Sequence, residues 1–209
     1  MIRLESKIIA IAVLLVSTAA ASAQGSGPVE IVRDTTATLF ELVDGNRSVY
    51  ESDSALLRRD IRDILLAHID VVYSGRLVLG RSGRNLSRDQ VVEFANALSD
   101  LLISRYADGL LEFRTRDQVE ILPLAGDNTE RMTRVRTRVG LDSGEQAPVD
   151  YVFRFADGQW KIFDVIVEGI SYVATFRNQI GEEIRNTGFD ATLERLKRGE
   201  IDIEIELND

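Results

Sequence analysis

The residues best suited to chemistry are two carboxylates in the second half of the chain, Asp164 and Asp150. Asp164 lies in a stretch that is otherwise mostly apolar or aromatic, and Asp150 directly precedes Tyr151. A carboxylate among apolar side chains can take up or deliver a proton near neutral pH, because burial raises its pKa. An enzyme that transfers protons through one of these carboxylates is therefore one hypothesis. The alternative role for Asp164 is an ion pair with a nearby arginine.

Other catalytic or metal-binding arrangements have little support. Ser171, His68 and an aspartate would form the only Ser-His-Asp triad, but no G-x-S-x-G pattern surrounds Ser171. His68 follows Ile61, Ile64 and Leu65 at helical spacing, which favours a partly buried packing residue. The chain has no cysteine and only one histidine, which excludes disulfides, thiol nucleophiles and Cys- or His-rich metal centres. We therefore expect no metal and no cofactor.

The charge balance argues against a nucleic-acid partner. The chain has 209 residues, and 25 Lys and Arg against 34 Asp and Glu give a formal net charge of −9. Binding to phosphates requires a surplus of basic residues on one face. Two groups of arginines allow either a solvated surface or a docking patch for acidic partners or anionic lipid surfaces. The first group alternates along predicted strands and consists of Arg134, Arg136, Arg138 and Arg154. The second group is associated with a loop and consists of Arg76, Arg81 and Arg84.

Residues 1–23 have the composition of a cleavable signal peptide. Arg3 and Lys7 precede an apolar run from Ile8 to Val16, and Ala21-Ser22-Ala23 forms an A-x-A cleavage site. This run is shorter than the roughly 20 apolar residues of a membrane span, so an uncleaved anchor is the weaker alternative. We expect an exported, soluble protein with one domain over 24–199 and an acidic tail over 200–209.

Helical spacing of apolar residues dominates the first half of the chain. It predicts helices over 28–45, 57–68 and 71–80. A longer helix begins at Ser87, because Ser87 and Gln90 have the spacing of a capping box. Helices return after Gly169, end at Gly188, and resume in a short final helix capped by Asp190.

Between these helices the apolar period changes to two, which is typical of half-buried strands. Strands are predicted around 119–121, 135–139, 151–155 and 160–167, with Asp157-Gly158 as a tight hairpin turn. Helices, a meander of strands and helices again predict an α+β domain with an antiparallel sheet of about four strands. The tail alternates apolar and acidic residues from Ile201 onward, so it is either an added edge strand or a frayed acidic terminus.

One segment carries a family resemblance. Residues 160–171 have the pattern W-K-x-x-D-V-x-V-E-G-x-S, and the stretches 75–80, 102–106, 149–153, 172–178 and 186–196 agree with it. In these segments, and over about 29–199, the chain resembles the MlaC family of periplasmic phospholipid-binding shuttles, also called toluene-tolerance proteins. It departs from the family in the arginine-containing loop after Gly80, where members often carry an aspartate and a tryptophan.

The resemblance implies an NTF2-like twisted sheet packed with helices around an apolar pocket for phospholipid acyl chains. It implies a periplasmic, monomeric carrier without enzymatic activity, whose cargo is a phospholipid. Its partners would be an outer-membrane lipoprotein complex and the inner-membrane lipid-binding ring protein of an ABC transporter. The enzyme alternative would use the same NTF2-like cone with Asp164 or Asp150.

The pocket walls are expected to come from the strands and from two helices. Each residue could instead simply fill a core, because most apolar residues at these spacings pack against one another. Ile170 is the strongest single candidate, since Gly169 before it allows a sharp turn. Glu168 and Ser171 are expected to bond the backbone or cap the following helix, and contact with a lipid head group is the weaker alternative. The expected lining residues are Phe94, Leu98, Leu101, Tyr106, Val135, Val139, Tyr151, Phe153, Val165, Val167, Ile170, Tyr172, Val173 and Phe176.

Overall fold

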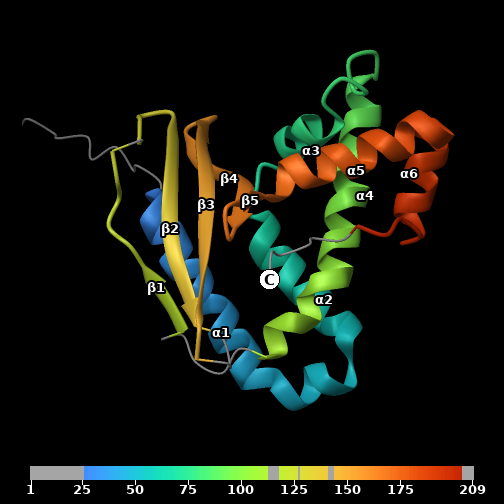
Figure 1. Cartoon of the computed structure of the whole chain (residues 1–209). Coiled ribbons are helices and arrows are strands. Elements are labelled where there is room, and N and C mark those ends of the chain that lie inside the picture. Colours follow the sequence, from blue (N-terminus) through green and yellow to red (C-terminus); the bar gives the residue numbers. More distant parts are fainter. Residues whose placement is uncertain (1–25, 113–117, 127, 141–143, 204–209) are drawn as a thin grey trace, which may run out of the picture.

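The computed structural model describes residues 26–112, 118–126, 128–140 and 144–203. The predicted signal peptide lies outside these residues. The sheet forms one side of the molecule, α3 to α6 form the other, and α1 runs along the sheet toward the base of the helical part (Figure 1). The elements in chain order are α1 (Pro28–Ser52), α2 (Ser54–Leu66), α3 (Val71–Leu79), α4 (Arg88–Tyr106), the 3-10 helix η1 (Ala107–Glu112), β1 (Val119–Ile121), β2 (Met132–Gly140), β3 (Gln146–Ala156), β4 (Gln159–Val167), β5 (Ile170–Ser171), α5 (Tyr172–Thr187) and α6 (Phe189–Lys197).

The sheet is an open antiparallel meander in the order β1-β2-β3-β4-β5. The predicted α+β class and the four predicted strands are confirmed, and β5 is an additional short strand. Asp157 and Gly158 both have positive φ, 51° and 78°, as the right-handed twist of a two-residue hairpin requires. Glu168 and Gly169 repeat this conformation with φ of 53° and 83°, which turns β4 back into β5.

Helix α1 covers one part of the sheet. Ile31 and Val32 pack there against Val135 and Phe153, and all four side chains are buried. The predicted end at Gly45 is wrong, because α1 continues to Ser52.

The end of α1 is held by its packing and by a hydrogen bond to α2. The buried Tyr50 donates to Asp60 of α2 at 2.9 Å. The gain from these contacts exceeds the cost of one exposed glycine in a helix, about 1 kcal/mol. Helix α1 therefore continues past Gly45.

The helical part has its own core, built from α3, α4, α5 and α6. The predicted capping box starts α4: Gln90 N donates to Ser87 Oγ at 3.2 Å, and Ser87 N donates to Gln90 Oε1 at 2.9 Å. Helices α3 and α4 cross at Gly75, where an added Cβ would lie 2.5 Å from Ala95 Cβ. Gly75 therefore allows a close approach that any side chain would prevent.

The segment after α6 returns to this helical core. Ile201 and Ile203 are buried there, and Arg105 Nη2 donates to Ile201 O at 3.2 Å. Both alternatives predicted for the tail, an edge strand and a frayed end, are wrong for residues 201–203. These residues pack against the helical core and form no strand of the sheet. Residues 204–209 lie outside the described residues.

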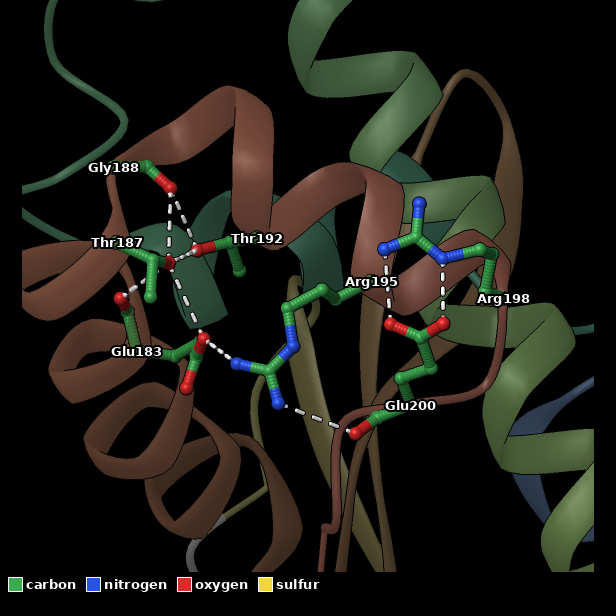
Figure 2. Close-up of polar contacts among 7 residues, drawn as sticks. All are labelled: Glu183, Thr187, Gly188, Thr192, Arg195, Arg198 and Glu200. Atoms are coloured by element: carbon green, nitrogen blue, oxygen red, sulfur yellow. Dashed lines mark hydrogen bonds and ion pairs between the residues drawn. The ribbon is translucent and has the colours of Figure 1, made fainter.

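A polar network joins α5, α6 and this segment (Figure 2). Arg195 pairs with Glu183 of α5 and donates to Glu200 O at 3.4 Å, while Arg198 holds the Glu200 carboxylate through two hydrogen bonds of 2.6 and 2.9 Å. The predicted cap Asp190 is wrong. The N-cap position is Gly188, with φ of 84°.

Candidate functional site

A cavity of about 470 Å³ lies between the helices and β4. This volume is in the range of about 300–1,000 Å³ that is usual for ligand pockets. Its walls come from α2, α3, α4, η1, β4 and α5. The lining residues are Ile61, Leu65, Leu66, Ile69, Val71, Ser74, Gly75, Val78, Ala95, Leu98, Ser99, Leu102, Ile103, Tyr106, Ala107, Leu110, Ile162, Phe163, Asp164, Val165, Tyr172, Val173 and Phe176.

The link between α2 and α3 is tied to the sheet beside the cavity. Ile162 N donates to His68 O at 2.8 Å, and Asp70 N donates to Ile162 O at 2.7 Å. Helix α3 is in turn fixed to α4 at Gly75. These attachments fix the positions of the α2–α3 link and of α3, both of which contribute to the cavity walls.

A β-bulge in β4 directs consecutive residues to the cavity. Val152 pairs with Asp164 and Phe153 with Ile162, which leaves Phe163 without a partner on β3. A bulge breaks the strict alternation of side chains between the two faces of a strand. As a result, four consecutive residues from Ile162 to Val165 line the cavity.

The polar side chains in the lining bond to the protein itself. Ser74 Oγ is 2.9 Å from Asp70 O and 2.8 Å from Phe163 O, and Ser99 Oγ donates to Ala95 O at 2.9 Å. Asp164 accepts from Ser171 Oγ at 2.6 Å and from Val173 N at 3.0 Å. Because these groups are satisfied, the cavity favours apolar contents.

Asp164 and Ser171 together start α5. Ser171 Oγ accepts from Ala174 N at 3.0 Å and donates to Asp164, whose other oxygen accepts from Val173 N. The predicted capping role of Ser171 is confirmed, and its hydroxyl is bonded to Asp164. The prediction that Asp164 pairs with an arginine is wrong. Among the described residues, its partners are two donors at the start of α5, Ser171 Oγ and Val173 N. The negative charge of this carboxylate also interacts favourably with the positive end of the α5 helix dipole.

We expect Asp164→Ala to lower the free energy of unfolding by about 1.5–3 kcal/mol, because it removes two hydrogen bonds to a charged group. Chemical denaturation of the lipid-free protein measures this loss. Asp164→Asn is the matched control, since it keeps an acceptor oxygen for Val173 N and should lose less. An Ala variant as stable as the wild type would contradict the capping role.

Two tyrosines line the cavity, and one of them affects the pKa of a third, Tyr151. Tyr106 and Tyr172 line it, and Tyr106 is 42% exposed and donates to Ile203 O at 3.2 Å. Burial raises the pKa of Tyr172 and of Tyr151, and the neighbouring Tyr172 raises that of Tyr151 further. Both phenols therefore stay protonated at neutral pH and cannot act as bases.

The chain matches a known protein family over most of its length. The family model described as MlaC protein matches residues 33–198. The chain belongs to the MlaC family. Among curated relatives of this MlaC-family chain, the "intermembrane phospholipid transport system binding protein MlaC" of Haemophilus influenzae is 24% identical over 83% of the chain and 82% of that protein. The "toluene tolerance protein ttg2D" of Pseudomonas putida is 26% identical over 78% and 75%.

A solved structure shares the fold of this MlaC-family chain. The phospholipid-binding protein from Ralstonia solanacearum, solved in complex with a phospholipid, has a TM-score of 0.69 at 20% identity. The match covers 82% of the chain and 93% of that structure. The sheet and helices around the cavity therefore have the architecture of a known fold.

The structure brings six of the residues expected at the MlaC-type pocket into the cavity lining. These are Leu98, Tyr106, Val165, Tyr172, Val173 and Phe176. No residue of α2 or α3 is expected there from the sequence, although the helical spacing of Ile61 and Leu65 indicates an apolar face. That face meets the cavity because α2 lies opposite β4.

The other expected residues lie elsewhere. Phe94 and Leu101 are buried in the helical core, and Val135 and Phe153 are buried beneath α1. Val139 and Tyr151 line a separate cavity of about 110 Å³ between α1 and the sheet. Val167 and Ile170 pair across the β4–β5 turn, half-buried, and line neither cavity.

The remaining chemical candidates are engaged in the structure. Arg134 Nη1 lies 3.6 Å from Asp150 Oδ2, and Arg154 pairs with Asp70 and lies over the Tyr73 ring at 4.1 Å. Across the described ranges, no group of three or more His, Asp or Glu residues could hold a metal ion. No helix in the same ranges is both long and apolar enough to cross a membrane.

Proposed function

We propose that the protein binds a phospholipid with its acyl chains in the 470 Å³ cavity. The apolar lining of this cavity, in a member of the MlaC family, is the observation that carries the proposal. The name of the Haemophilus influenzae relative and the phospholipid complex of the structural neighbour support it.

The energetics of hydrocarbon transfer agree with this cargo. Each methylene group removed from water gains about 0.8 kcal/mol, both in a bilayer and in a dry protein cavity. A carrier must therefore offer walls with few unsatisfied polar groups, or the lipid stays in the membrane. Ser74, Ser99 and Asp164 meet this requirement because their polar atoms bond within the protein.

As for its place in the cell, we propose a monomeric shuttle in the periplasm. It would carry phospholipid between an outer-membrane lipoprotein complex and the inner-membrane lipid-binding ring protein of an ABC transporter. The signal peptide predicted over 1–23 and the name of the Haemophilus influenzae relative support this role. The phospholipid would be cargo and not a cofactor.

No catalytic step belongs to the proposal. Asp164 is fixed as a helix cap, and Asp150 is paired with Arg134. The two carboxylates considered for proton transfer thus have structural partners that account for their positions.

We expect the protein, expressed as the full 209-residue chain and purified without detergent, to retain a diacyl phospholipid. Organic extraction followed by mass spectrometry identifies the lipid and its molar ratio to protein. A protein without an apolar cavity, purified by the same route, controls for lipid carried over from membranes. Repeated recovery of no more lipid than in this control would contradict the proposal.

A further inference from the structure

A third hollow lies on the outside of the helical part. This groove, of about 760 Å³, runs between the end of α3, the turn that follows it, and α5. Five arginines line the groove together with a single carboxylate, that of Glu182. The arginines are Arg76, Arg81, Arg84, Arg177 and Arg185.

This concentration of positive charge is unusual for a chain with a net charge of −9. Arginines on the sheet have acidic partners: Arg138 lies 3.8 Å from Glu120, and Arg134 lies 3.6 Å from Asp150. By contrast, none of the five groove arginines forms an ion pair with any other described residue, and all five are exposed. Because the groove gathers five positive charges against one carboxylate, its field favours an anionic partner.

The groove shares two of its wall helices with the 470 Å³ cavity. Helix α3 contributes Val78 to the cavity and Arg76 to the groove, and α5 contributes Phe176 to the cavity and Arg177 to the groove. Arg177 Nε donates to Leu77 O at 2.6 Å, which fixes the two helices to each other. The groove and the cavity are thus opposite faces of one rigid helix pair.

We propose that this groove docks an acidic segment of a partner protein, whose Asp and Glu side chains pair with the five arginines. Guanidinium groups match carboxylates through paired hydrogen bonds, and charge complementarity of this kind sets the rate and orientation of docking. The inference deepens the proposed function, because it assigns a surface through which the carrier meets a partner.

The shape and the charge both favour a protein over a bilayer. The groove is concave, and a flat bilayer surface would touch only its rim, whereas an extended segment can enter it. The acidic remainder of the chain is repelled by an anionic membrane, whose field extends over about a Debye length, roughly 8–10 Å. The negative charge of a bound protein segment, by contrast, lies only in the groove and does not repel the acidic remainder of the chain.

The test compares two variants with the same change in net charge. Arg81→Glu with Arg84→Glu reverses the turn side of the groove, and Arg33→Glu with Arg131→Glu reverses two exposed arginines outside it. The probe is a fluorescein-labelled oligoglutamate peptide, whose binding to the full chain is followed by fluorescence anisotropy at low and high salt. Sedimentation with phosphatidylglycerol vesicles is measured in parallel.

We expect the wild type to bind the peptide in a salt-sensitive manner and the groove variant to bind it about tenfold more weakly or not at all. The control variant should keep most of the affinity. The proposal is overturned if the wild type does not bind the peptide, or if both variants lose affinity equally. Vesicle binding that depends on Arg81 and Arg84 would also overturn it, in favour of an anionic lipid surface.

Lipid content separates this result from the proposed function. All variants should retain phospholipid like the wild type, since none of the four residues lines the cavity. A protein that contains no lipid but docks the peptide would contradict the proposed function alone. A protein that carries lipid but shows no groove-dependent binding would contradict this inference alone.

Discussion

Ile203→Ala is expected to lower the free energy of unfolding by about 2–5 kcal/mol, the usual cost of removing a buried isoleucine side chain. Ile203 is fully buried in the helical core, although it lies only six residues from the end of the sequence. Its carbonyl accepts from Tyr106, and the preceding Asp202 pairs with Arg105. The cavity left by the alanine cannot close because α4 and α6 are held by their own contacts. Urea denaturation of the lipid-free protein measures the loss.

Val49→Ala is the control for this variant, because Val49 is 45% exposed at the end of α1. Exposed substitutions of this kind change stability by no more than about 0.5 kcal/mol. If Ile203→Ala had an equally small effect, residues 201–203 would not be part of the core in solution. The same outcome would remove the structural role assigned to the Arg195 and Arg198 network.

Ser99→Phe is expected to have opposite effects on lipid content and on stability. Ser99 lines the large cavity, and its hydroxyl bonds only to Ala95 O of its own helix. A phenylalanine there fills space that acyl chains would occupy, so the bound phospholipid should fall severalfold. Filling the cavity should also raise the free energy of unfolding of the lipid-free protein by about 0.5–2 kcal/mol. Quantitative lipid extraction and denaturation measure the two effects on the same preparation.

The matched control is Ser104→Phe, on the exposed face of the same helix and outside the cavity lining. It makes the same chemical change but should leave the lipid content at the wild-type level. Two results would contradict the assignment of the cavity: a Ser99→Phe protein with normal lipid content, or equal losses in both variants. A loss of lipid together with reduced stability would indicate general disruption and not a filled cavity.

The sequence predicted best those helices and strands whose ends carry a recognisable capping or turn motif. The capping box at Ser87 and the Asp157-Gly158 turn are encoded within a few residues, and the structure confirms both. The strand β5 was missed because two residues, Ile170 and Ser171, are too short to show a period. The prediction that α1 ends at Gly45 is wrong, because packing of the buried Tyr50 keeps the chain helical beyond that glycine.

The lining of the cavity was less predictable, because it depends on which helix covers which part of the sheet. Val135 and Phe153 have the expected strand pattern, yet α1 covers them. The contribution of β4 depends on the bulge at Phe163, which changes the facing of consecutive residues. The alternation of side chains along a strand does not predict the position of this bulge. The role of α2 likewise follows from long-range placement and not from its own spacing.

The most direct test of the central claim is to locate the bound acyl chains. The protein is loaded with a phospholipid that carries a photoreactive diazirine near the end of one acyl chain, irradiated, digested and analysed by mass spectrometry. The account predicts cross-links to cavity residues such as Leu66, Leu102 and Phe163. Cross-links confined to the outer surface, or to Phe40 and Val139 of the small cavity beneath α1, would contradict it.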